Sequence, residues 1–224
     1  MPQPPFSLTH VSRPPLQPGE GKAPSALLLH GFGSNEEDLM GLAPFMDPRL
    51  HLLSARAPVA MGARMYGWYM IQMLSSGEFH FSEEEARHSL RLIHAFIDEA
   101  MAHYDLDPTR LFLVGFSQGA IQSSATLLMA PEKVAGIAAM SGRWPEPAER
   151  ERAPDAQLVA KPVLVVHGLY DDVIPIRYAH TVKEKFEALP VTFTYQEFPM
   201  GHTVSLESAT LLNQWLAARL DELE

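Results

Sequence analysis

The sequence predicts an α/β fold with a mostly parallel central sheet and helices on both of its faces. Short, continuous apolar runs such as LFLV and PVLVVHG are typical of strands that are buried on both faces of a parallel sheet. Segments with helical spacing of apolar residues lie between these runs, so helix and strand alternate along most of the chain. Because no linker separates two apolar cores, we expect residues 1–224 to form a single domain.

The first part of the chain is expected to supply two strands joined by a turn, then a helix and a third strand. Residues 6–11 and 26–29 are the two predicted strands, and the turn-rich segment RPPLQPGEGKAP lies between them. Asn35 is a candidate N-cap for the helix, because three acidic residues follow it, and Pro44 would end or kink that helix. The segment HLLSARAP is the predicted third strand.

The rest of the chain continues the alternation. Ser82 and Glu85 form a capping-box pattern at the start of a long amphipathic helix. A strand over residues 111–114 is followed by a helix from about Gln118 to Met129, which Pro131 stops. The remaining strands are predicted in VAGIAAM, PVLVVHG and VTFTYQEF, and the remaining helices in RYAHTVKEKFEAL and VSLESATLLNQWLAARLDEL. Residues 143–157 are predicted as a polar surface loop beside the site.

Composition excludes several classes of function. The formal net charge of −10 disfavours binding to nucleic acid or to an anionic membrane surface. The absence of cysteine excludes disulfides, thiolate metal sites and a cysteine nucleophile. No apolar run approaches the roughly 20 residues of a membrane span, and the N-terminus lacks the pattern of a signal peptide. We therefore expect a soluble, cytoplasmic protein without membrane insertion.

The segment GFSQGA places one serine between two glycines, directly after an apolar strand and before a predicted helix. Residues 115–119 match the pattern G-x-S-x-G, in which the serine sits on a sharp turn between a strand and a helix. The glycines permit that turn and a close approach of helix to strand. Ser117 is therefore a candidate nucleophile, and the alternative is a serine that only caps the helix.

A serine nucleophile needs a histidine to accept its proton and an acid to orient that histidine. Asp171 and Asp172 follow the strand PVLVVHG, at the end of the sheet where open α/β sheets place their sites. His202 lies in a glycine-containing loop after the last strand. The order serine, acid, histidine is the one expected for such a sheet, with Asp172 as the rival acid to Asp171.

The oxyanion formed in acyl transfer needs two backbone N–H groups that point at one position. The residue after the nucleophile, Gln118, would supply one of them at the start of a helix. The turn in LLLHGFGSN follows an early strand and would supply the other from Phe32. The alternative for this second segment is a glycine turn without a ligand.

Five segments, LLHGFGSNEEDL, RAPVAMGARMYGWYMI, GFSQGA, HGLYDDVIP and PMGHTVS, occur in this order. Together they resemble the phospholipase/carboxylesterase family of α/β-hydrolases, which includes small bacterial carboxylesterases and acyl-protein thioesterases. The resemblance implies the α/β-hydrolase fold and a triad of Ser117, Asp171 and His202, with the acid taken from H-G-x-x-D. It also implies an oxyanion hole formed by Phe32 and Gln118.

The same resemblance points to the aromatic stretch at residues 66–69. In the family this stretch lies near the acyl pocket, which implies that Trp68 and Tyr69 contact substrate. Packing in the core is an alternative of equal weight. An acidic residue commonly follows there, whereas this chain has Met70, so the substrate class stays unassigned by the resemblance.

The function expected from these features is a carboxylesterase-type serine hydrolase that forms an acyl-enzyme intermediate. Its substrates would be small soluble esters with short to medium acyl chains, because QMLSSGEFHF offers little material for a large lid. An acyl-protein thioesterase or lysophospholipase is the first alternative, and a non-catalytic scaffold that binds a ligand is the second. No metal or cofactor is implied. The expected partner is a small ester or thioester rather than nucleic acid, with a homodimer left open.

Overall fold

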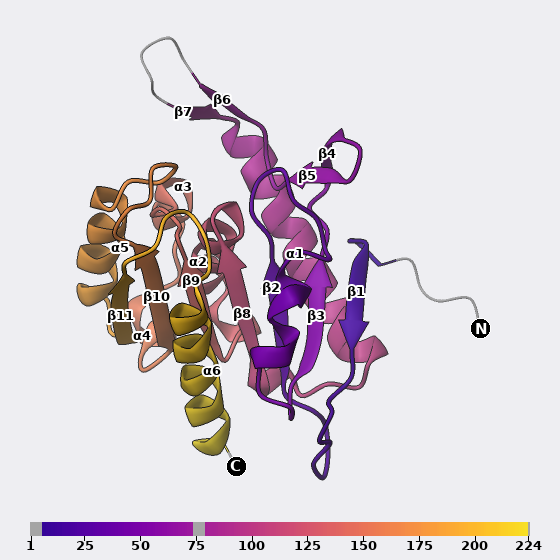
Figure 1. Ribbon diagram of the computed structural model, residues 1–224. Coiled ribbons are helices and arrows are strands. Elements are labelled where there is room, and N and C mark those ends of the chain that lie inside the picture. Colours follow the sequence, from indigo (N-terminus) through magenta and orange to yellow (C-terminus); the bar gives the residue numbers. More distant parts are fainter. Residues whose placement is uncertain (1–5, 74–78, 224) are drawn as a thin grey trace.

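A seven-stranded sheet forms the centre of the computed structural model, which describes residues 6–73 and 79–223 (Figure 1). The strand order is β1-β3-β2-β8-β9-β10-β11, and only the pair β1–β3 is antiparallel within this sheet. The predicted mostly parallel sheet is therefore confirmed. The strands are β1 (His10–Arg13), β2 (Ser25–Leu29), β3 (His51–Ala55), β8 (Leu111–Phe116), β9 (Gly136–Met140), β10 (Pro162–Gly168) and β11 (Thr192–Phe198).

Helices cover both faces of this sheet. On one face, Leu27 and Leu29 of β2 belong to the cluster that contains Ile93 and Phe96 of α1. On the other face, Leu28 belongs to a cluster with residues of α6. This alternation explains why the central strands are continuously apolar, since both of their faces are buried. The longer helices are α1 (Glu83–His103), α2 (Gln118–Met129), α5 (Arg177–Glu187) and α6 (Leu206–Asp221), and the short ones are η1 (Leu39–Phe45), η2 (Pro108–Arg110), η3 (Pro131–Lys133), α3 (Glu146–Glu149) and α4 (Asp155–Leu158).

The prediction for the first two strands is wrong in two respects. The first strand spans His10–Arg13 instead of residues 6–11, and it pairs with β3 and not with β2. Strand β2 has no free side, because β3 and β8 both pair with it in parallel. The partly exposed β1 suits the edge of the sheet, where one side of a strand stays unpaired.

The helix predicted after Asn35 is also different. A 3-10 helix, η1, begins only at Leu39 and contains Pro44 within it. The Asn35 side chain accepts a hydrogen bond from the N–H of Glu37, two residues on, and so forms a local turn. Glu36 is held by Arg56, whose Nε donates to the carboxylate at 2.7 Å. The segment after Asn35 is a turn that leads into η1.

Two small hairpins between β3 and α1 were not predicted. The first joins β4 (Val59–Gly62) to β5 (Met65–Gly67), and the second joins β6 (Ile71–Met73) to β7 (Phe79–Phe81). The second hairpin projects away from the sheet in Figure 1. Residues 74–78 of QMLSSGEFHF lie outside the described residues, so the expectation of a short lid stays untested.

The N-terminus of α1 carries the predicted cap. The Ser82 side chain accepts a hydrogen bond from the N–H of Glu85 at 3.2 Å. The Glu85 carboxylate, however, does not return to Ser82 but accepts from the N–H of Met70 at 2.9 Å. The Glu85 side chain thereby joins α1 to the segment before β6. None of the helices in the described ranges combines the length and apolar composition that a membrane crossing requires.

Candidate active site

Ser117 occupies a sharp turn between β8 and α2. Its backbone φ is 54°, a left-handed value that is unfavourable for a residue with a side chain. A Cβ added at Gly119 would lie 1.9 Å from the Leu29 carbonyl oxygen, and one added at Gly115 would lie 2.3 Å from that of Gly119. Both glycines are therefore required by backbone contacts. Ser117 therefore lies where the backbones of β2, β8 and α2 pack too closely for a side chain at either glycine.

The structure brings Ser117, His202 and Asp171 into one chain of hydrogen bonds. Nε2 of His202 lies 2.9 Å from Oγ of Ser117, and Nδ1 of His202 lies 2.7 Å from Oδ2 of Asp171. These residues follow β8, β11 and β10 respectively, so the carboxyl ends of three strands supply them. An imidazole in this position can accept the serine proton while the carboxylate holds the ring.

Asp171, rather than Asp172, is the acid that meets His202. The Asp171 carboxylate is completely buried, and its second oxygen accepts hydrogen bonds from the N–H groups of Val173 and Ile174 at 3.0 and 2.7 Å. These donors fix the orientation of the carboxylate. Asp172 is exposed. The geometry therefore favours the first of the two acids that the sequence had left open.

The two predicted oxyanion donors have free N–H groups. Neither Phe32 nor Gln118 donates its backbone N–H to an acceptor among the described residues, whereas neighbouring Gly33 donates to the Tyr66 carbonyl. The Gln118 N–H also lies at the N-terminus of α2, where the helix dipole favours negative charge. Phe32 and Gln118 line the same cavity as Ser117 and can serve one negatively charged oxygen in it.

That cavity has a volume of about 460 Å³. Its walls include the apolar side chains of Ile121 and Ile174 and the ring of Tyr178. Tyr69 also lines it, and burial raises the pKa of this phenol to about 12, so the hydroxyl stays protonated at neutral pH. Trp68 does not line the cavity and is fully buried, with Nε1 donating to the His30 carbonyl. The structure thus packs Trp68 in the core, the alternative given above.

Comparison with known proteins assigns the chain to a family. The family model described as Phospholipase/Carboxylesterase matches residues 16–219. The chain belongs to the phospholipase/carboxylesterase family. This is a family of hydrolases, and the resemblance noted in the sequence is confirmed.

Individual members of the phospholipase/carboxylesterase family are similar over much of the chain. Acyl-protein thioesterase 1 of Kluyveromyces lactis is 30% identical over 168 residues, which cover 71% of each chain. A probable carboxylesterase of Oryza sativa is 26% identical over 208 residues, 88% of each chain. The crystal structure of esterase PE8 superimposes with a TM-score of 0.76 at 27% identity, covering 94% of this chain and 98% of that one. The predicted α/β-hydrolase fold is thus confirmed.

Two histidines that support the site were missed by reasoning from the sequence. His167 is buried, donates from Nε2 to the Ile174 carbonyl at 2.7 Å, and lies 3.4 Å from Oδ2 of Asp171. Burial lowers the pKa of His167, which keeps it neutral. The family motif H-G-x-x-D begins with this residue and was the signal that could have indicated it.

The second histidine, His30, holds the loop that carries Phe32. It donates from Nδ1 to the Gly31 carbonyl at 2.7 Å and accepts from the N–H of Ala57 at 3.1 Å. Burial lowers the pKa of His30, consistent with a neutral ring that donates on one side and accepts on the other. The H-G-x-G motif of the family contains it, but its partner Ala57 could not be deduced from the sequence.

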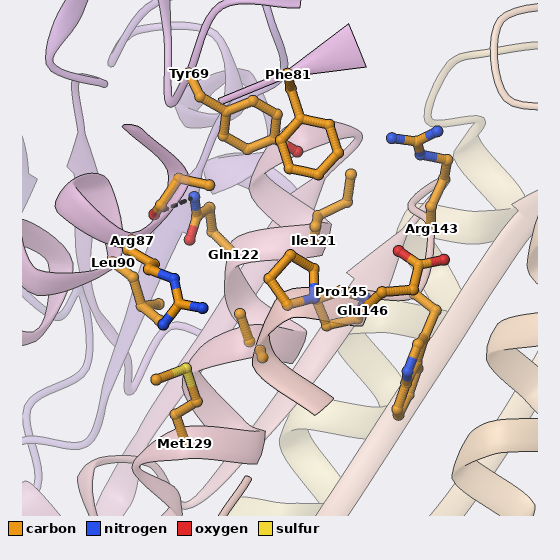
Figure 2. A pocket seen from close by; sticks show the side chains of 15 residues that line it. Tyr69, Phe81, Arg87, Leu90, Ile121, Gln122, Met129, Arg143, Pro145 and Glu146 are labelled. Carbon is orange, nitrogen blue, oxygen red and sulfur yellow. Dashed lines mark hydrogen bonds between the residues drawn. The ribbon is translucent and has the colours of Figure 1, made fainter. Parts of the chain in front are cut away.

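A narrow crevice adjoins the cavity of this family member. Tyr69, Ile121 and Arg143 line both spaces, and the crevice has a volume of about 40 Å³. Figure 2 looks into the crevice, with Tyr69 and Phe81 at the top, Met129 at the bottom and Arg143 on the right. The short α3 segment within residues 143–157 closes one side. The insert predicted as a surface loop therefore forms part of the wall.

Proposed function

We propose that this chain is a serine esterase that cleaves carboxylic esters through an acyl-enzyme intermediate. The observation that carries the proposal is the hydrogen-bonded order Ser117, His202, Asp171, with distances of 2.9 and 2.7 Å. A serine hydroxyl is a weak nucleophile at neutral pH and becomes effective when an oriented imidazole accepts its proton. Membership of the phospholipase/carboxylesterase family supports the same chemistry.

In the first half of the reaction, Nε2 of His202 takes the proton as Oγ of Ser117 bonds to the ester carbonyl carbon. The carbonyl electrons move to its oxygen, which the N–H groups of Phe32 and Gln118 stabilise. His202 then gives the proton to the alcohol oxygen as the bond between the carbonyl carbon and that oxygen breaks. The Asp171 carboxylate orients the imidazolium and stabilises its charge.

In the second half, a water molecule attacks the acyl-serine carbonyl and loses a proton to His202. The tetrahedral intermediate again places its negative oxygen at the two N–H groups. When it collapses, Oγ of Ser117 leaves and recovers the proton from His202, and the carboxylic acid is released. The same residues therefore serve both acylation and deacylation, so removal of Ser117 prevents both.

For the substrate, we propose small esters with short to medium acyl chains. The cavity of about 460 Å³ has apolar walls, so methylene groups that fit in it add roughly 0.8 kcal/mol each. The adjoining crevice adds only about 40 Å³, which limits further extension. The rate should rise with chain length until the cavity is full and then fall.

Acyl-protein thioesterase activity is the alternative, and the similarity to acyl-protein thioesterase 1 of Kluyveromyces lactis favours it. The same triad chemistry would serve a thioester, because only the leaving group differs. A non-catalytic binding scaffold is the third proposal. It has no chemical need for a serine, a histidine and a buried carboxylate aligned by hydrogen bonds, which speaks against it.

Two experiments separate these proposals. A fluorophosphonate probe should label the wild-type protein but not Ser117→Ala, and labelling of the folded variant would contradict the assignment of the nucleophile. Values of kcat/KM should then be measured for p-nitrophenyl esters from acetate to palmitate and for an acylated-peptide thioester. A maximum at short to medium length supports the esterase, whereas a maximum at palmitate or a faster thioester reaction supports the thioesterase.

A further inference from the structure

Two arginines beside the cavity differ from every other cation in the chain. Within the described ranges, which include all lysines and arginines, the side chains of Arg143 and Arg177 have neither an ion pair nor a hydrogen bond. Each of the others pairs with a carboxylate or donates to a backbone carbonyl. In a chain with 27 acidic and 17 basic residues, carboxylates are in excess, so these two charges stand out.

Both arginines flank the same wall of the cavity. The Arg143 guanidinium lies 5.6 Å from the centroid of the Tyr178 ring, and that of Arg177 lies 4.8 Å from it. Tyr178 and Arg143 line the cavity together with Ser117 and His202. An otherwise apolar cavity therefore has one cationic side, next to the proposed nucleophile.

The charge of Arg143 acts across the cavity. It favours the ionised form of Tyr69 on the facing wall, although burial outweighs this and still raises the pKa of that phenol. Glu146, on the same segment, acts on Tyr69 in the opposite sense, and among the described residues it forms no ion pair with Arg143. Figure 2 shows the two side chains on the same side of the crevice, with the guanidinium of Arg143 set apart from the Glu146 carboxylate.

We propose that Arg143 binds a carboxylate on the substrate, with Arg177 as an outer charge, so that monoesters of dicarboxylic acids are the preferred substrates. This inference rests on the proposed esterase function of Ser117. A guanidinium presents two parallel N–H donors that match a carboxylate, and attraction between them is stronger in a cavity than in bulk water.

The acyl side of the ester is the side that this arrangement fits. Ile121 lies one helical turn after Ser117 on α2 and lines both the cavity and the crevice, as Arg143 does. An acyl chain bonded to Ser117 that extends along Ile121 would carry a terminal carboxylate to Arg143. Because this carboxylate stays on the acyl-enzyme, Arg143 would hold it through both halves of the reaction.

The test compares monoethyl esters of dicarboxylic acids, from succinic to suberic, with ethyl esters of the corresponding monoamides. The amide has the same length and shape but no charge, so the ratio of the two kcat/KM values measures recognition of the carboxylate. We expect the wild type to prefer the carboxylate by about tenfold or more at its best chain length. Arg143→Gln should reduce this ratio to near one, and Arg143→Lys should keep part of it.

A control variant and a variant of the outer charge sharpen the comparison. Lys22 is an exposed cation that pairs with Asp105 and precedes β2, at the opposite end of the strands from Ser117. Lys22→Gln should therefore leave the ratio unchanged. Arg177→Gln should lower it less than Arg143→Gln. If Arg143 only supports Tyr178, its replacement will slow both ester classes alike and leave the ratio intact, which would overturn the proposal.

A binding experiment makes the inference independent of turnover. Calorimetry should detect monoethyl adipate binding to Ser117→Ala and weaker binding, by about tenfold or more, to the double variant Ser117→Ala/Arg143→Gln. Equal binding to both would overturn the proposal. A wild type that hydrolyses the amide esters without a preference for the carboxylate would also overturn it while leaving the esterase function intact. Failure of probe labelling at Ser117 would instead overturn the proposed function.

Discussion

The side chain of Gln118 clamps the backbone of Trp68 and Tyr69. Its Oε1 accepts a hydrogen bond from the Trp68 N–H at 2.7 Å, and its Nε2 donates to the Tyr69 carbonyl at 2.8 Å. The same residue lines the cavity beside Ser117. One glutamine thus joins the start of α2 to the segment that forms the facing wall.

Replacing Gln118 should therefore affect the wall more than the oxyanion donor. Gln118→Ala keeps the backbone N–H but leaves two buried backbone groups without partners, which should lower the free energy of unfolding by about 1–3 kcal/mol. We expect kcat/KM to fall less than in Ser117→Ala. Urea unfolding and steady-state kinetics measure the two effects. Gln122→Ala, which removes one 3.2 Å bond to the Ala86 carbonyl, is the matched control and should cost less stability.

Gly119 is the position where a single methyl group should be least tolerated. The Cβ of Gly119→Ala would lie 1.9 Å from the Leu29 carbonyl oxygen, so β2 and α2 would have to separate. We expect little soluble protein or a loss of several degrees in Tm, measured by thermal unfolding. Gly41→Ala, where no atom lies within 4 Å of the added Cβ, should fold normally. Equal behaviour of the two variants would contradict the close packing at the turn.

The strain at Ser117 predicts a gain in stability when its side chain is removed completely. Because its φ is 54°, Ser117→Gly should be more stable than Ser117→Ala by about 1 kcal/mol, since glycine alone adopts left-handed values without a Cβ penalty. Both variants lack the proposed nucleophile and should lose activity by roughly 10³-fold or more. Urea unfolding of the two purified variants compares their stabilities. An alanine variant as stable as the glycine one would show that the turn holds no strain.

The two aspartates should differ in their effect on activity. Asp171→Asn removes the carboxylate that contacts His202 at 2.7 Å, and an equivalent change in a serine protease triad lowers kcat by about 10⁴-fold. The exposed Asp172→Asn is the matched control and should keep nearly full kcat/KM. A greater loss of activity in the Asp172 variant would show that Asp172, and not Asp171, is the acid. Circular dichroism of both variants should exclude unfolding as the cause.

The fold was predictable from the sequence where local pattern decides the structure. The run of residues 111–114, the G-x-S-x-G turn and the helix from Gln118 to Met129 follow one another without a break, and the structure has α2 at the predicted bounds. Ser117, Asp171 and His202 were identified by their positions after successive strands. The structure brings them within hydrogen-bonding distance, while their catalytic roles stay predictions.

Contacts between residues that are distant in sequence could not be predicted from local pattern. Strand β1 pairs with β3 because β2 is already paired on both sides, and no property of residues 6–13 alone reveals this. Trp68 could equally have faced the cavity or the core, since an aromatic ring suits both. The supporting role of His30 depends on the N–H of Ala57, which follows it by 27 residues.

The buried and half-buried histidines predict that the protein loses stability in mild acid. Burial lowers the pKa of five histidines below the ordinary value of about 6.5, namely His10, His30, His51, His94 and His167. In the unfolded chain these rings take up protons as the pH falls below 6.5, whereas in the folded protein they resist protonation. The unfolded state then binds more protons, so the free energy of unfolding decreases as the pH falls through this range.

Urea unfolding between pH 8 and pH 5.5 measures this dependence, above the range in which most carboxylates titrate. We expect full stability above pH 6.5 and a progressive loss below it. His51 is a suitable single test, because it is buried and its Nε2 lies 2.7 Å from the Ser12 hydroxyl. His51→Gln can keep a hydrogen bond but cannot take up a proton, so its stability should depend less steeply on pH than that of the wild type. An unchanged slope would show that His51 titrates alike in the folded and unfolded states.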